Sequence, residues 1–185
     1  MRIMLVGDVV GRAGRRAFRA ITPRLRAERR IDVVIVNGEN SAGGKGFTRK
    51  ALDELYAGGA DVVTSGNHVW DKKDVFTFID DEPFLVRPAN YPEGTPGQGY
   101  CIFPFKAANI AVINLSGRSF MPPLDCPFQK ADEILAALED QADIIVLDFH
   151  AETTSEKLAM AHYLDGRADI VVGTHTHVQT ADARI

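Results

Sequence analysis

Residues 32–66 read DVVIVNGENSAGGKGFTRKALDELYAGGADVVTSG, and this stretch decides the fold class. Its two β-branched runs, DVVIV and DVVT, are short and continuously apolar, as in the buried strands of parallel sheets. The run between them, TRKALDELYAGG, has a helical pattern, with Thr48 as N-cap and Gly58 and Gly59 as C-terminal stops. The stretch therefore predicts a strand–helix–strand unit with parallel strands.

The same alternation continues on both sides of this unit. RIMLVG precedes an arginine-rich helix, and DVVTSG is followed by a segment beginning WDKKDVFTFI. Farther along come a helix near 128–139, the strand ADIIVLDFH, the helix TSEKLAMAHYLDG and the strand ADIVVGTH. Between the two series, FLVRPANY, GYCIFPF and NIAVINLSG are strand-like runs that predict a second sheet or an antiparallel edge. We expect one α/β domain over residues 1–185.

Composition argues against several classes of protein. The formal net charge is -4, which gives no global reason to expect nucleic acid or a membrane surface as partner. The apolar runs are far shorter than the ~20 residues of a membrane helix. The two cysteines, Cys101 and Cys126, make no disulfide framework, and no signal-like leader opens the chain. The sequence therefore predicts a cytoplasmic protein with no membrane association.

The glycine-rich segment VNGENSAGGKGFT, residues 36–48, invites comparison with a phosphate-binding P-loop. A P-loop needs glycine, four residues, glycine, lysine, and then serine or threonine. When the segment is aligned on Lys45, Glu39 stands at the first glycine position and Gly46 at the hydroxyl position. The segment therefore fails two of the four requirements of a P-loop. Glu39 and Asn40, which break the match, are candidate functional residues instead.

Polar side chains follow five of the predicted strands at their carboxyl ends, where open parallel sheets bind ligands. Four of the five histidines belong to this set, and the exception, His162, lies within a predicted helix. Carboxylate oxygens and imidazole nitrogens are ligands of zinc, manganese and iron, and the set offers no thiolate. The set consists of Asp8, Glu39, Asn40, Asn67, His68, His150, His175 and His177.

These groups outnumber the ligands of a single ion. With Glu39 as a bridge, two ions could share them at a separation of ~3.5 to 4 Å. His175 and His177 are two residues apart and, if extended, would point to opposite sides, which suits one histidine on each ion. His68 is the natural general acid because imidazole titrates near neutral pH. The alternative is that His68 is a further metal ligand.

In chain order, the motifs GDVVG, NGENSAGG, SGNHVWD, DFHAE and GTHTHVQT resemble those of the calcineurin-like metallophosphoesterase superfamily. The chain is more closely similar to the YmdB family within it, over essentially its full length. Five ordered motifs are far more specific than a lone GNH. The resemblance implies an α/β sandwich of two sheets flanked by helices, two iron or manganese ions, with zinc as a further option, and a cyclic-nucleotide substrate.

The resemblance also implies individual roles. It places Asp8, Glu39, Asn40 and His177 around the first metal, and Glu39, Asn67, His150 and His175 around the second, with His68 as the proton donor. Val10 stands where the wider superfamily has a histidine ligand, and Asn40 is expected to replace that ligand. By the resemblance, relatives continue past Ile185 with strands that complete the second sheet, so either the chain is truncated at its C-terminus or the numbering ends before the domain does.

The predicted function is a dinuclear metal-dependent phosphodiesterase acting on 2',3'- or 3',5'-cyclic nucleotides. A metal-bridging hydroxide would attack phosphorus, and His68 would protonate the leaving oxygen. Two alternatives stay open: a phosphomonoesterase or protein phosphatase, and a non-catalytic, metal-bearing regulatory or RNA-binding protein. Eight arginines lie between Arg12 and Arg30, and they predict either a solvated helical face with a break at Pro23 or a patch that steers RNA or nucleotide phosphates. A homo-oligomer also stays open.

Overall fold

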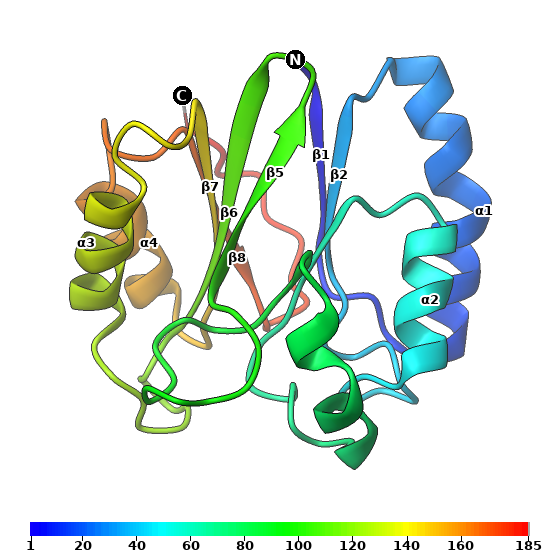
Figure 1. The fold of residues 1–185 in the computed structure, drawn as a ribbon, viewed down its shortest axis with the longest axis horizontal. Coiled ribbons are helices and arrows are strands. Elements are labelled where there is room, and N and C mark those ends of the chain that lie inside the picture. The colour runs from blue at the N-terminus through cyan, green and yellow to red at the C-terminus, as the bar shows by residue number, and fades with distance from the viewer. Residues whose placement is uncertain (185) are drawn as a thin grey trace.

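The computed structural model describes residues 1–184, which form two four-stranded sheets packed face to face (Figure 1). Helices α1 (Gly11–Arg29) and α2 (Arg49–Ala57) cover one outer side of this pair of sheets. Helices α3 (Pro127–Ala137) and α4 (Thr154–Tyr163) cover the other outer side. The predicted two-sheet α/β sandwich flanked by helices is confirmed.

The first sheet is entirely parallel and contains β1 (Ile3–Val6), β2 (Val33–Asn37), β3 (Val62–Thr64) and β4 (Leu85–Val86), in that order. The segment beginning WDKKDVFTFI does not form the expected helix. It forms two 3₁₀ turns, η1 (Lys73–Thr77) and η2 (Ile79–Asp81). Tight 3₁₀ turns align residues three apart, and Val75 and Phe78 are both buried against the first sheet's core.

The second sheet contains β5 (Tyr100–Phe105), β6 (Ala108–Ser116), β7 (Ile144–His150) and β8 (Ile170–Thr174). Strand β5 pairs antiparallel with β6, whereas β6, β7 and β8 are parallel. The strand-like runs in the middle of the sequence therefore form both of the features predicted as alternatives, a second sheet and an antiparallel edge.

Alternate residues of each strand pack into different layers of the core, because successive side chains point to opposite faces of a sheet. In β2, Val34 and Val36 join the cluster beneath α1 and α2, whereas Val33 and Ile35 join the cluster between the sheets. A third cluster, beneath α3 and α4, includes Met160. Each near-continuous apolar run of the sequence thus contributes side chains to two layers of the core.

The layer between the sheets changes from apolar to polar near the carboxyl ends of the strands. Strand β7 shows the change, since Val146 lies in the apolar cluster and the next residues of the same parity, Asp148 and His150, are polar and buried. Other strands follow the same rule. We call the following residues the buried polar layer: Asn37, Thr64, Asn114, Ser116, Asp148, His150 and Thr174.

Helix α1 runs through Pro23 without the break that the sequence predicted. Proline removes one backbone hydrogen bond, but tertiary packing supplies most of the stability of a helix in a protein. Phe18 and Thr22, which are buried on the preceding turn, provide such packing. Within residues 1–184, neither α1 nor any other helix combines the length and apolarity needed to cross a membrane.

Candidate metal centre

The candidate site lies at the carboxyl ends of the parallel strands, where both sheets contribute residues next to the buried polar layer. Loops after β1, β2 and β3 supply residues from the first sheet, while the end of β7 and the segment after β8 supply residues from the second. The structure joins all eight predicted residues in one continuous set of contacts: Asp8, Glu39, Asn40, Asn67, His68, His150, His175 and His177.

Glu39 is at the centre of this set and is only 1% exposed. Its Oε2 accepts the backbone N–H of His68 at 3.0 Å. Its Oε1 accepts the side-chain amide of Asn40 at 2.9 Å and lies 3.2 Å from His150 Nε2. Glu39 therefore contacts both halves of the site, as a bridging carboxylate would.

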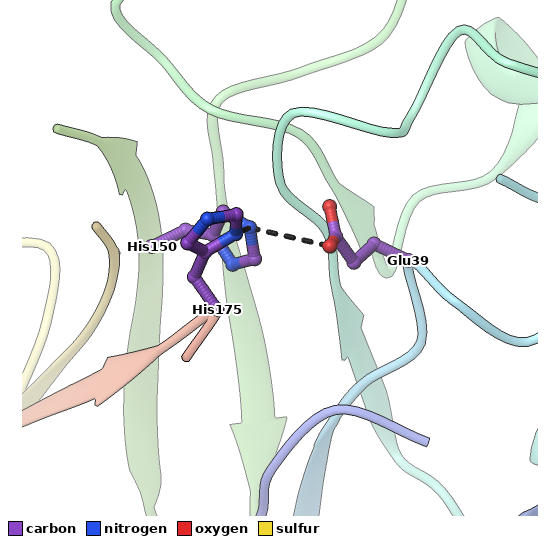
Figure 2. Close-up of side chains that lie close together, drawn as sticks. All are labelled: Glu39, His150 and His175. Atoms are coloured by element: carbon purple, nitrogen blue, oxygen red, sulfur yellow. Dashed lines mark hydrogen bonds and ion pairs between the residues drawn. The ribbon is translucent and has the colours of Figure 1, made fainter. Parts of the chain in front are cut away.

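One group of possible metal-ligand atoms surrounds Nε2 of His150, a residue that is completely buried. Asn67 Oδ1 lies 2.9 Å and His175 Nδ1 lies 3.0 Å from this nitrogen. Figure 2 shows the imidazoles of His150 and His175 on one side and the carboxylate of Glu39 on the other. The centroids of the two rings are 4.8 Å apart. One ligand atom from each of Glu39, His150 and His175 lies within 4.8 Å of the other two.

A second group of donors surrounds Asp8. His177 Nε2 lies 3.1 Å from Asp8 Oδ2, and the amide nitrogen of Asn40 lies 3.5 Å from each of these two atoms. The backbone N–H of His175 donates to the Asp8 carboxylate at 3.3 Å. Asn40 therefore turns its nitrogen toward this group, and coordination through its oxygen requires a half-turn of the amide, which interchanges the positions of its O and N atoms.

The spacing of these atoms is compatible with cation binding. Atoms bound at ~2.0 to 2.2 Å to one cation lie about 3 Å from one another, which is the spacing found here between donor atoms. Carboxylate oxygens, amide oxygens and imidazole nitrogens suit zinc, manganese or iron, whereas the two free cysteines, Cys101 and Cys126, belong to neither group. Glu39 is the residue that the two groups share.

Electrostatics favour the charged form of Glu39. Burial alone would raise its pKa, but the hydrogen bond and charge attraction of His150, together with the His68 N–H, lower the pKa overall. The same attraction raises the pKa of His150 against the effect of burial. Burial and the neighbouring His150 lower the pKa of His175. Glu39 is therefore a carboxylate, which is the form that binds cations.

The ring of His68 lies beside Asp71, with Nδ1 2.9 Å from Asp71 Oδ2. The His68 side chain is 25% exposed, so it borders solvent and is accessible to a ligand. The sequence did not indicate Asp71, because in a loop a spacing of three residues from His68 does not predict a contact. The contact between His68 and Asp71 fixes the orientation of the imidazole at this edge of the first sheet.

The fragment THTH is not extended, so the premise used for it was wrong. His175 has φ 90° and His177 has φ 55°, which is the left-handed region that L residues seldom adopt. The two rings still lie in different groups, because His175 faces His150 and His177 faces Asp8. Backbone turns, and not strand alternation, distribute these histidines between the two groups.

Three further residues that the sequence analysis missed contact the site. Thr174 Oγ1 lies 2.9 Å from His150 Nδ1 and 2.7 Å from Asp148 Oδ1. Glu152 Oε2 lies 3.0 Å from His175 Nε2. Strand parity was the available signal for Thr174 and Asp148, because both share the inward face of their strands with apolar residues of the core.

Gly66 brings the backbone closer to the donors than any other residue type would allow. A Cβ at this position would overlap His150 Nε2 and Glu39 Oε2. The glycine does not have a positive φ, so free space, and not backbone conformation, is what requires it here. The GNH motif thus contributes a position without a side chain, Gly66, as well as the polar side chains of Asn67 and His68.

Comparison with known families and proteins identifies close relatives. Residues 4–185 match the family model described as YmdB-like protein. The chain is 56% identical over 185 residues to a protein of Bacillus subtilis (strain 168) named 2',3'-cyclic-nucleotide 2'-phosphodiesterase. That match covers 100% of this chain and 70% of the relative.

Solved structures agree with the fold. A hypothetical protein from Thermus thermophilus superimposes with a TM-score of 0.93 at 46% identity, covering 100% of this chain and 71% of that chain. A structure of Mycoplasma pneumoniae described as a novel phosphatase superimposes with a TM-score of 0.92 at 38% identity, covering 99% of this chain and 66% of that one.

Proposed function

The chain belongs to the YmdB-like protein family, and from that membership we propose that it is a metal-dependent phosphodiesterase acting on cyclic nucleotides. The observation that carries the proposal is the convergence of eight metal-competent or proton-transferring residues at one edge of two sheets. A relative at 56% identity is named for the same reaction class, which supports the substrate assignment.

In this proposal Asp8, Asn40 and His177 hold one cation, and the Glu39 bridge links it to a second. Asn67, His150 and His175 complete the second site. The donor set suits iron or manganese, with zinc as a further option, and the metal present in the cell decides among them. When bound, two cations supply Lewis-acid polarisation of a phosphoryl oxygen and an activated water nucleophile.

His68 is the proposed proton donor to the leaving oxygen. Its Nδ1 faces the Asp71 carboxylate at 2.9 Å, so Nδ1 carries a proton and the outer Nε2 faces away from that partner. The contact with Asp71 orients the ring, so Nε2 is the nitrogen that would donate to the leaving oxygen. The backbone of His68 is tied to Glu39, which fixes the distance between the proton donor and the proposed cations.

The test compares a diester with a monoester. Metal-reconstituted protein should hydrolyse bis-p-nitrophenyl phosphate and 2',3'-cyclic AMP with a higher kcat/KM than p-nitrophenyl phosphate. Faster cleavage of the monoester would instead establish the second candidate, a phosphomonoesterase, which is favoured by the likeness to a structure described as a novel phosphatase. Hydrolysis of neither class by protein with two bound ions would overturn both.

We further propose that the protein acts in the cytoplasm. Cys101 is buried, with a pKa raised to about 12 by burial, and Cys101 and Cys126 are both free. Free cysteines are compatible with a reducing compartment. RNA binding by the arginines of α1 and self-association as a homo-oligomer stay predictions.

A further inference from the structure

We propose that Asp148 and Thr174 hold His150 in the tautomer with its proton on Nδ1, which directs the Nε2 lone pair into the metal centre. Asp148 and Thr174 are then positioning residues that act through His150. The inference rests on the proposed function to the extent that His150 is taken as a metal ligand. Its central observation is a chain of hydrogen bonds that runs through the buried polar layer.

Thr174 is the middle member of this chain. Its Oγ1 lies 2.7 Å from Asp148 Oδ1 and 2.9 Å from His150 Nδ1. A hydroxyl has a single proton to donate. If that proton points to Asp148, the same oxygen can only accept from His150, and Nδ1 must then carry a hydrogen.

The other contacts of His150 decide which way this proton points. Glu39, Asn67 and His175 all face Nε2, so a cation held among them would take the Nε2 lone pair and leave the ring proton on Nδ1. Thr174 Oγ1 is then the acceptor of the Nδ1–H, and its own proton goes to Asp148 Oδ1. Asp148 Oδ2 contacts Thr64 Oγ1 at 2.5 Å and Asn37 Nδ2 at 3.1 Å, so the orientation of its carboxyl group is fixed.

The orientation of the Asn37 amide is itself fixed by two backbone groups. Its Nδ2 donates to the carbonyl oxygen of Ser65 at 3.0 Å, and its Oδ1 accepts the N–H of Glu39 at 3.2 Å. An amide with its oxygen and nitrogen interchanged would face a carbonyl with an acceptor and an N–H with a donor. Asn37 Nδ2 is therefore a donor, and it faces Asp148 Oδ2 at 3.1 Å and Thr174 Oγ1 at 3.4 Å.

Burial keeps solvent from competing with these contacts. Asp148, Thr174 and His150 are 3%, 8% and 0% exposed, so a rotated hydroxyl would not find water as a substitute partner. On the other side of the ring, Asn67 Oδ1 and Glu39 Oε1 lie 2.9 Å and 3.2 Å from Nε2. The imidazole thus contacts Thr174 at Nδ1, while its Nε2 faces the oxygen atoms that would share a cation with it.

The first test removes the middle member of the chain. Thr174→Val keeps the shape of the side chain and deletes the hydroxyl, so Mn²⁺ affinity, measured by titration of the purified protein, should fall about 10- to 100-fold. Thr174→Ser restores the hydroxyl and should bind Mn²⁺ within about threefold of wild type. Mn²⁺ binding by Thr174→Val at wild-type strength would overturn the inference.

Thr64→Val is the matched control. It removes a buried hydroxyl that contacts the same carboxylate but does not touch His150. Its thermal stability should fall as in Thr174→Val, whereas its Mn²⁺ affinity should stay within about threefold of wild type. An equal loss of Mn²⁺ affinity in both variants would show that the buried polar layer only supports the fold, and the inference would be wrong.

Asp148→Asn tests the direction of the chain. Because Asn37 Nδ2 is a donor and lies nearer to residue 148 than to Thr174, the new amide should turn its oxygen to Asn37 and its NH₂ to Thr174. Thr174 would then donate to His150 Nδ1 and move the ring proton to Nε2. Nitrogen-15 NMR of labelled histidines should show Nδ1–H with Nε2 coordinated in the Zn²⁺-loaded wild-type protein, and Nε2–H in the variant.

These readouts separate the inference from the proposed function. If the wild-type protein binds Mn²⁺ and shows the Nδ1–H tautomer but hydrolyses no phosphodiester, the proposed function fails and the inference stands. If wild-type His150 coordinates through Nδ1, or carries its proton on Nε2, the inference fails whatever the activity.

Discussion

The backbone and the side chain of His68 have separate roles at the site. The N–H donates to Glu39, whereas the ring contacts Asp71 and faces outward. His68→Ala should therefore lower kcat for bis-p-nitrophenyl phosphate by about 10²- to 10⁴-fold, the usual contribution of a general acid. Elemental analysis should find normal metal content, because the N–H that supports Glu39 remains. Loss of the metals would mean that the ring is a ligand.

The space left by Gly66 can be tested in the same way. Gly66→Ala places a methyl group against His150 and Glu39 and should abolish Mn²⁺ binding, at an overpacking cost of about 1–3 kcal/mol in the free energy of unfolding. Gly7→Ala is the control, because a Cβ at Gly7 meets nothing within 4 Å and this glycine also lies at the rim. Mn²⁺ titration of both variants checks the prediction, and equal affinities would contradict it.

Single residues differ in how far the sequence revealed them. The eight site residues were found because each stands where a recognisable strand ends, and the topology then brings those ends together. Asp71 was not found, since its contact with His68 depends on the path of a loop. Asp148 and Thr174 carried a weaker signal, strand parity, which becomes informative only when the face shared by the two sheets is known.

Among the elements, the connection between the two sheets depends on Arg87. This residue is 8% exposed, and its guanidinium donates to the carbonyl oxygens of Pro96, Pro88 and Thr95 at 3.0, 2.8 and 3.0 Å. Arg87→Met leaves three carbonyls without these donors and should lower the free energy of unfolding by about 3–5 kcal/mol. Urea denaturation measures the effect.

Arg24→Met is the control for this prediction. Arg24 forms a surface ion pair with Glu28, and their side chains are 68% and 57% exposed. Such pairs contribute little, so the loss should be about 0.5 kcal/mol or less. If Arg87→Met were equally mild, the connection between the sheets would have to be held by its other contacts.

Element types were predictable where local signals and packing agreed. Thr48 caps α2 as expected, accepting the N–H of Ala51, and the strand–helix alternation gives the parallel first sheet. Local signals failed where packing overrode them. Pro23 does not end α1 because Phe18 and Thr22 are buried before it and Arg26 contacts Gly59, Asp61 and Asp32 after it. The segment after β3 forms 3₁₀ turns that bury Val75 and Phe78.

At the scale of the whole molecule, the proposed cations join two sheets whose strands are paired only within each sheet. Their ligands come from β1, β2 and β3 on one side and from β7 and β8 on the other. Binding at a concentration 100 times the Kd adds about 2.7 kcal/mol to stability, which corresponds to a rise in Tm of about 5–10 °C for a chain of this size. Thermal melting with EDTA and with Mn²⁺ measures this difference.

Glu39→Ala provides the control for the melting experiment. Without the bridging carboxylate both proposed sites are incomplete, so the Tm of this variant should not respond to Mn²⁺. An unchanged wild-type Tm would show that the cations do not couple the sheets. A full response in the variant would show instead that Mn²⁺ stabilises the protein from somewhere else.

The two sheets are also consecutive in the chain, since β1 to β4 end at Val86 and β5 begins at Tyr100. Neither proposed ligand set is complete without the second half, because one needs His177 and the other needs His150 and His175. A ribosome must therefore extend the nascent chain past these histidines before either set is whole. Metallation is then a late event of biogenesis, and the first sheet has to fold without a cation as template.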